Sequence, residues 1–268
     1  MSGRVITVTS GKGGVGKTTV TANLAAALAA TGKKVVALDS DIGLRNLDIV
    51  MGLENRIVYD LVDVIEGRCK LRQAMIRDKR LPELYLIPAA QTRDKMAVSP
   101  SDMVLLCDQL REEADYIMID SPAGIERGFR NAIAPADHVL IVTNPEVSAV
   151  RDADRIIGLI EAEEKGPARL IVNRLKPAMV ARQDMLSVED IWDILRVDII
   201  GIIPEDEAIL VASNSGAPVA MSMNGHRPLS GKAFHNIAQR LEGHTVPMLD
   251  LNEKNGLVGR LQRWVAGL

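Results

Sequence analysis

Residues 11–18 read Gly-Lys-Gly-Gly-Val-Gly-Lys-Thr, and this stretch decides the fold. Its spacing, Gly-x-x-x-x-Gly-Lys-Thr, is the P-loop pattern, which binds nucleotide phosphates. An apolar, β-branched run at 4–9 precedes it, and an Ala- and Leu-rich run at 17–30 follows it. These runs predict a strand and a helix, which is the context that the motif requires. The alternative, a glycine-rich turn without a ligand, is disfavoured because glycines, lysine and threonines agree in register.

Each position of the loop has its own physical role. Glycines let the backbone turn so that successive N–H groups converge on phosphate oxygens, and the following helix adds its positive dipole end. Lys17 is placed to reach the β- and γ-phosphates, and the hydroxyl of Thr18 can ligate Mg²⁺. The residues predicted to bind the nucleotide here are Gly11, Lys12, Gly13, Gly14, Val15, Gly16, Lys17, Thr18 and Thr19.

The composition indicates a globular protein with an aliphatic core. Of the 268 residues 47% are hydrophobic, and the aromatic residues are only two Trp, three Tyr and two Phe. The 32 basic and 35 acidic residues give a net charge of −3, which supplies no global electrostatic reason to bind nucleic acid.

The two cysteines and the apolar runs indicate the cellular compartment of the protein. Cys69 and Cys107 lack C-x-x-C spacing, which suggests a reducing cytosol and disfavours disulfides, structural zinc and iron–sulfur clusters. No apolar run approaches the roughly 20 residues that span a bilayer. Because the first strand and the P-loop begin at once, no signal peptide is expected. We therefore expect a cytoplasmic protein.

Apolar runs alternate with helical stretches along the chain, and most of these runs do not alternate in polarity. Such runs are typical of a parallel sheet that is covered on both faces. We predict the α/β class: a single doubly wound, mostly parallel sheet with helices on both faces, of the P-loop NTPase type, plus a C-terminal amphipathic helix. The domain organisation is then an ATPase domain at 1–243, a linker at 244–255 and a membrane-targeting helix at 256–268. The predicted strands are 4–9, 34–39, 84–88, 116–120, 138–143, 169–173 and 199–203, and the predicted helices are 17–30, 57–66, 100–113, 150–164, 187–196, 206–214 and 230–242.

Three aspartates follow predicted strands, at the sheet edge where open α/β folds bind ligands. Asp120 ends the very apolar run Tyr-Ile-Met-Ile-Asp and is the expected Walker B partner of Mg²⁺; Asp39 and Asp41 follow the second strand. With Thr18, we predict Asp41 and Asp120 as the metal ligands. The predicted catalytic residues are Lys12 and Lys17, which neutralise charge, Asp41, which positions the water, and Asp39, which supports the Asp41 loop. The alternative is that these aspartates are ordinary strand-end or loop residues.

Lys12 is unusual because it occupies an outer position of the P-loop. From there it need not fold onto the phosphates that Lys17 serves, and it could reach a nucleotide that is bound by a second subunit. A solvated surface lysine is equally compatible with the loop position alone.

Several segments together resemble the MinD family of deviant Walker A ATPases. Besides the P-loop with Lys12, the resemblance includes Asp-Ile-Gly-Leu-Arg-Asn-Leu-Asp at 41–48, Asp-Ser-Pro-Ala-Gly-Ile-Glu at 120–126, and further matches at 88–95, 143–155 and 203–206. The matches are in order over roughly residues 4–215, and 215–253 departs most from the pattern.

The resemblance implies an Mg²⁺-dependent ATPase of the bacterial division-site system, peripheral on the inner face of the cell membrane or its plastid equivalent. It implies that ATP drives formation of a homodimer in which Lys12 acts across the interface. A MinC-type division inhibitor would bind the ATP form, and a MinE-type partner would stimulate hydrolysis and release. The family positions are Arg45 and Asn46 near the partner surface, Glu146, Ser148 and Asp152 in the dimer- and partner-facing segment, and Asn173, Pro204, Glu205 and Asp206 on the adenine side.

The last residues predict a membrane-binding helix. An apolar stripe at helical spacing is formed by Leu257, Val258, Leu261, Trp264, Val265 and Leu268, and Arg260 and Arg263 add positive charge. An apolar face with Trp and a basic polar face are typical of an interfacial helix on an anionic membrane. One such tail binds weakly, whereas two tails on a dimer gain avidity. The alternative is a terminal helix that docks on its own core.

Three rival functions remain open. A ParA-like DNA-partitioning ATPase would need an extended basic surface, which the acidic balance disfavours. A cluster carrier of the nitrogenase iron-protein type would need cysteines at the dimer axis, where neither Cys69 nor Cys107 is expected. A metabolic ligase on this fold would need a second substrate pocket.

Overall fold

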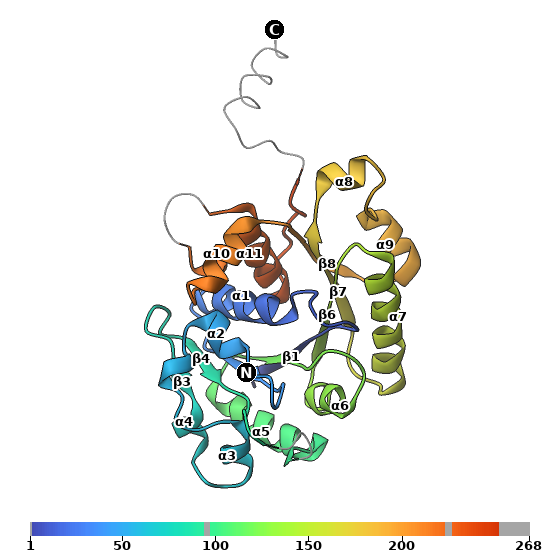
Figure 1. Ribbon diagram of the computed structural model, residues 1–268. Helices are drawn as coiled ribbons and strands as arrows, with labels where there is room; N and C mark the ends of the chain where they lie inside the picture. The colour runs from blue at the N-terminus through green and yellow to red at the C-terminus, as the bar shows by residue number, and fades with distance from the viewer. Residues whose placement is uncertain (1, 94–96, 223–226, 252–268) are drawn as a thin grey trace.

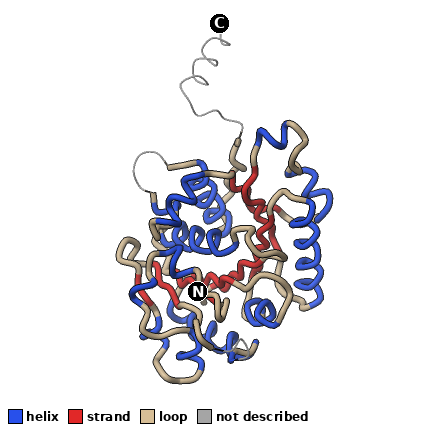
Figure 2. Tube along the Cα trace, viewed as in Figure 1, coloured by secondary structure: helices blue, strands red, loops and turns tan. Residues whose placement is uncertain are grey.

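The computed structural model describes residues 2–93, 97–222 and 227–251, and a central sheet runs through this part of the chain (Figures 1 and 2). The eight strands lie in the order β3-β4-β2-β5-β1-β6-β7-β8. All neighbours are parallel except β3 and β4, which pair antiparallel at one edge. The strands are β1 (Arg4–Thr9), β2 (Val35–Asp39), β3 (Ile76–Arg77), β4 (Leu84–Ile87), β5 (Tyr116–Asp120), β6 (His138–Thr143), β7 (Ala168–Leu175) and β8 (Ile199–Pro204).

Helices cover both faces of the sheet. Helices α1, α2, α10 and α11 pack on one face, and α3, α5, α6, α7 and α9 pack on the other. The helices are α1 (Lys17–Ala29), α2 (Leu47–Met51), α3 (Leu61–Ile65), α4 (Leu71–Ala74), α5 (Pro100–Glu113), α6 (Arg127–Ile133), α7 (Val147–Ala162), α8 (Pro177–Ala181), α9 (Val188–Leu195), α10 (Glu207–Asn214) and α11 (Leu229–Leu241), with 3₁₀ turns at Glu54–Arg56 and Val219–Met221.

The side chains of the central strands are buried alternately on the two faces. In β5, Met118 belongs to the apolar cluster under α1 and α11, whereas Ile117 and Ile119 belong to the cluster under α5. A strand that is buried on both faces reads as a continuous apolar run, which is why these strands show no alternation in the sequence.

The doubly wound fold predicted from the sequence is confirmed, and the predicted strands at 116–120 and 138–143 coincide with β5 and β6. The expectation for 57–66 was too long, because α3 begins only after Asp60, whose side chain caps the N–H groups of Val62 and Asp63. The two-residue β3 and the short helices α2, α4, α6 and α8 were not predicted. Among the described helices, none combines the length and apolar character needed to cross a membrane.

Candidate nucleotide-binding site

The P-loop connects β1 to α1 and fits tightly between neighbouring elements. Gly14 and Gly16 have φ of 81° and 95°, in the left-handed region, and Gly16 is the N-cap of α1. A Cβ on Gly11 would lie 2.3 Å from the carbonyl oxygen of Asp152 on α7. The first turn of α1 has no side-chain cap and no acidic residue, so its N–H groups suit an anionic ligand.

Lys17 lies in a buried ion pair with Asp120. Its Nζ is 3.0 Å from Asp120 Oδ1, and only 8% of Lys17 and 1% of Asp120 are exposed. Thr21, one turn further along α1, donates a second hydrogen bond of 3.2 Å to the same oxygen. The predicted phosphate ligand and the predicted Walker B carboxylate therefore share one buried site. Thr21 was missed, although its position four residues after Lys17 places it on the same face of the helix.

Asp39 holds the loop that follows β2. It lies opposite Asp120 in the register of β2 and β5. Its Oδ1 accepts the N–H of Asp41 at 3.0 Å, and its Oδ2 accepts the N–H groups of Asn46 and Leu47 at 3.2 Å. Burial first, and the charge of Asp120 second, raise the pKa of Asp39 to about 7. Asp39 thus anchors both ends of the loop that carries Asp41.

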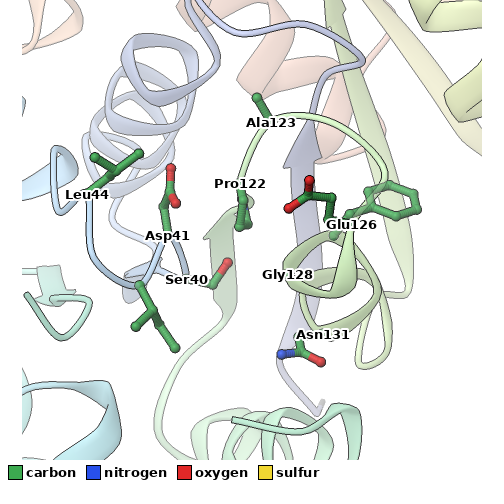
Figure 3. A pocket seen from close by; sticks show the side chains of 10 residues that line it. Ser40, Asp41, Leu44, Pro122, Ala123, Glu126, Gly128 and Asn131 are labelled. Atoms are coloured by element: carbon green, nitrogen blue, oxygen red, sulfur yellow. The ribbon is translucent and has the colours of Figure 1, made fainter. Parts of the chain in front are cut away.

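A hollow of about 160 Å³ lies beside this loop (Figure 3). Asp41 lines one side, Pro122 and Ala123 from the loop after β5 line another, and Glu126 at the start of α6 lies across from Asp41. The hollow therefore separates the two loops that follow the aspartate-bearing strands. Glu126 lies in the quoted 120–126 segment, but the sequence alone assigned it no role.

Of the residues predicted on the adenine side, Asn173 contacts the P-loop, whereas Pro204, Glu205 and Asp206 lie at the end of β8 and the start of α10. Asn173 is buried at the end of β7, and its Nδ2 donates to the carbonyl of Val15 in the P-loop at 2.8 Å. Pro204 ends β8, and the N–H of Glu205 donates to Leu175. Both carboxylate oxygens of Asp206 are engaged, one by the N-terminus of α10 and one by Ser230 of α11. In this structure Asp206 therefore joins two helices.

Lys12, Ser148 and Asp152 lie at the P-loop, whereas Arg45 and Asn46 lie in the loop before α2. Lys12 is exposed, and its Nζ donates to Ser148 Oγ on α7 at 3.4 Å. Glu146 is the exposed N-cap residue of α7, and Asp152 follows on the same helix. The Nε of Arg45 is 2.7 Å from Asp48 Oδ2, an ion pair without hydrogen-bond geometry.

Asn46 directly precedes α2, and its N–H donates to Asp39 Oδ2. The structure thus groups Lys12 with Ser148 and Asp152. The predicted membrane residues at 257–268 lie outside the described residues.

Comparisons with known proteins agree with this geometry. A model of the CobQ/CobB/MinD/ParA nucleotide binding domain matches residues 6–219. The septum site-determining protein MinD of Synechocystis is 56% identical, over 98% of this chain and 99% of its own length. The chain belongs to the MinD family.

Two solved structures are similar throughout. The MinD chain of the MinC:MinD cell division protein complex of Aquifex aeolicus has a TM-score of 0.84 and 48% identity, covering 92% of this chain and 98% of its own. The septum site-determining protein MinD of Pyrococcus horikoshii, complexed with Mg-ADP, has a TM-score of 0.80 and 30% identity, covering 89% and 96%.

Membership of the MinD family makes this chain a P-loop, nucleotide-binding ATPase of division-site selection. The ParA-like alternative is less supported, because MinD relatives match at 50% identity and above over nearly the whole chain. Thr18 and the carboxylates of Asp41 and Asp120 are the hard oxygen donors that Mg²⁺ prefers, so the residues present fit the metal.

Proposed function

We propose that this MinD-family chain hydrolyses ATP as a homodimer and that ATP controls its attachment to an anionic membrane. One observation carries the proposal: Lys17 is buried against Asp120, whereas the second lysine of the loop, Lys12, is exposed at the rim beside Ser148. Lys17 thus lies inside the nucleotide site, whereas Lys12 lies at a surface that a second copy can reach.

ATP binding would exchange the partner of Lys17. Its ammonium would leave Asp120 for the β- and γ-phosphate oxygens, and the freed carboxylate would join Thr18 and Asp41 in holding Mg²⁺. Mg²⁺ supplies charge neutralisation at these phosphates. Asn173 supports the P-loop through Val15, beside the adenine side that Pro204, Glu205 and Asp206 would complete.

Hydrolysis would then need an aligned water and little covalent chemistry from the protein. Asp41 would orient the water for in-line attack on the γ-phosphorus, breaking the bond to ADP and giving ADP and phosphate. Asp39 would hold the Asp41 loop through its three backbone hydrogen bonds. Lys12 from the second copy would neutralise charge that develops in the transition state.

The partners follow from the family. A MinC-type protein would bind the ATP dimer, as supported by the Aquifex aeolicus complex, and a MinE-type protein would stimulate hydrolysis. Arg45, Asn46, Glu146, Ser148 and Asp152 would form the partner and dimer surfaces. Residues 256–268 would bind the membrane peripherally, and a dimer would bring two such tails to one surface.

Co-sedimentation with anionic vesicles tests this function directly. Wild-type protein should pellet with ATP and stay in the supernatant with ADP or without nucleotide. A chain that lacks 256–268 should still bind nucleotide and should not pellet. Equal pelleting with ATP and ADP, or pelleting of the truncated chain, would contradict the proposal.

A further inference from the structure

The residues that directly follow α11 are hydrogen-bonded to the body of the protein. We call residues 244–251 the C-terminal connection. The N–H of His244 donates to Gln239 at 3.0 Å. Arg240 on α11 donates through Nε to Val246 at 3.0 Å and through Nη2 to Pro247 at 2.7 Å, both at the carbonyl oxygen. The first half of the connection is therefore held by one guanidinium group.

The same guanidinium group is fixed to the sheet. Its Nη1 donates to the carbonyl of Ile200 in β8 at 2.8 Å. Helix α11 lies so close to β8 that a Cβ on Gly201 would be 2.2 Å from Ile237 Cγ1. This close packing brings Arg240, one turn after Ile237, within reach of the strand. Arg240 thus ties strand, helix and connection together.

The chemistry of Arg240 suits this clamp. A guanidinium presents several N–H donors in a rigid fork, which a lysine ammonium cannot reproduce. Its three partners are all backbone carbonyl oxygens, and hydrogen bonds from a charged donor are stronger than neutral ones. Burial lowers the pKa of Arg240, as expected for a group held against the body.

The second half of the connection packs by apolar contact. Leu249 lies against the cluster under α1 and α11, and Leu251 lies against the cluster under α7 and α9. Met248–Leu251 also form one wall of a groove of about 520 Å³ beside α8. The chain is therefore held as far as Leu251, the last described residue before the predicted membrane segment.

We propose that Arg240 is a positioning residue for membrane attachment, because it sets the length of the tether between the body and residues 256–268. While the connection is held, four residues, 252–255, separate its end from residues 256–268; once loss of the clamp lets the apolar contacts of Leu249 and Leu251 open as well, twelve residues, 244–255, do so. The effective concentration of a second tail falls as about the −3/2 power of tether length, so a threefold longer tether predicts roughly fivefold weaker avidity. This inference rests on the proposed function and adds to it the residue that fixes the tether.

Vesicle binding by tether variants tests the role of the clamp. Arg240→Ala and Arg240→Lys should weaken binding of the ATP form to anionic vesicles about fivefold, with vesicle binding of the ADP form and ATPase activity in solution unchanged. The matched control is Arg182→Ala, which removes an exposed arginine near the groove whose side chain bonds Asp184. An eight-residue Gly/Ser insertion after Leu251, with Arg240 intact, should reproduce the loss. Wild-type avidity in the Arg240 variants or in the insertion variant would overturn the proposal.

Backbone order parameters measured by NMR provide a readout that does not depend on lipid. In wild-type protein, the order parameters of residues 245–250 should resemble those of α11, because Arg240 fixes two carbonyl groups of this segment. In Arg240→Lys they should fall, while those of β8 stay unchanged. Order parameters typical of a free peptide in the wild-type connection would overturn the clamp. Failure of the proposed function would show differently, as equal vesicle binding with ATP and ADP by wild-type protein, and would remove this role of Arg240 as well.

Discussion

Asp39 is buried beside Asp120, and its carboxylate bonds both ends of the loop that carries Asp41. Two buried carboxylates on adjacent strands cannot both ionise without cost, and Lys17 pairs with Asp120 rather than with Asp39. This arrangement explains why the pKa of Asp39 is raised to about 7 although three N–H groups favour its ionised form.

The raised pKa predicts a pH dependence of stability in the absence of nucleotide. Between an unfolded pKa of 3.8 and a folded pKa of about 7, the folded state binds the Asp39 proton more tightly than the unfolded state. The contribution of Asp39 to the free energy of unfolding should therefore fall as pH rises through this window, by up to about 1.4 kcal/mol per pH unit. The lowered pKa values of His138 and His235 add a slope of the opposite sign, which wild-type protein and the Asp39→Asn variant share. Asp39→Asn should remove the contribution of Asp39, as measured by urea denaturation from pH 4.5 to 7.5.

The carboxylates whose pKa is lowered do not mask this effect. The pKa of Asp78 and that of Asp137 are lowered by their hydrogen-bonded arginines, so the stability that each contributes is lost only as the pH falls toward the ordinary aspartate pKa and below it. Parallel curves for wild-type protein and Asp39→Asn across pH 4.5 to 7.5 would contradict the prediction.

At the scale of elements, the P-loop is shaped by its neighbours as much as by its own glycines. Gly11 packs against the backbone of α7, and Gly16 packs against Asn173 at the end of β7. By contrast, a Cβ on Gly13 would have no neighbour within 4 Å. The glycines of the loop therefore serve different purposes, and only some are required by packing.

This difference predicts unequal losses of stability for the same substitution at Gly11 and at Gly13. Gly11→Ala should destabilise the protein by about 1–3 kcal/mol, because its Cβ would force the loop away from Asp152. Gly13→Ala should change stability by less than about 0.5 kcal/mol without nucleotide. Thermal and urea unfolding of both variants checks this, and equal effects would mean that the contact with α7 does not limit the loop.

At the scale of the whole molecule, helices from both faces of the sheet lie next to the P-loop. Helices α1 and α2 lie on one face and α7 on the other, and Lys12 lies at this rim within reach of Ser148. The hydrogen bond from Lys12 to Ser148 is weak, at 3.4 Å. A triphosphate bound by a second copy would be a stronger, anionic partner for the ammonium group, so Lys12 could leave Ser148 and bind across the interface.

We predict that Lys12→Ala keeps nucleotide binding but loses ATP-driven dimerisation and hydrolysis. The expected loss of hydrolysis is of the order of 10²-fold or more, as for removal of a group that stabilises developing charge. Sedimentation velocity with ATP measures the dimer, and a phosphate-release assay measures turnover. Lys79→Ala, which removes an exposed lysine in the turn before β4, is the control. A Lys12→Ala chain that still dimerises with ATP would exclude this role.

Much of the fold and part of the site could be predicted from the sequence, because they depend on local signals. The P-loop is a contiguous strand, turn and helix start, so its glycines, Lys17 and Thr18 identify it without any distant contact. Buried strands such as β5 and β6 can be predicted from their apolar runs. The short helices cannot be predicted in this way, because four to seven residues carry too little periodicity and their formation depends on caps and packing.

By itself, then, the sequence determined the nucleotide-binding loop, the parallel sheet and the family. Only the tertiary structure decided which distant groups meet. The strand order β2-β5-β1 places Asp39 and Lys17 on either side of Asp120, although they are far apart along the chain. It also brought Asn173 to Val15 and Arg240 to the C-terminal connection. The reason is that hydrogen bonds and ion pairs form between neighbours in space, and the packing of helices on the sheet chooses those neighbours.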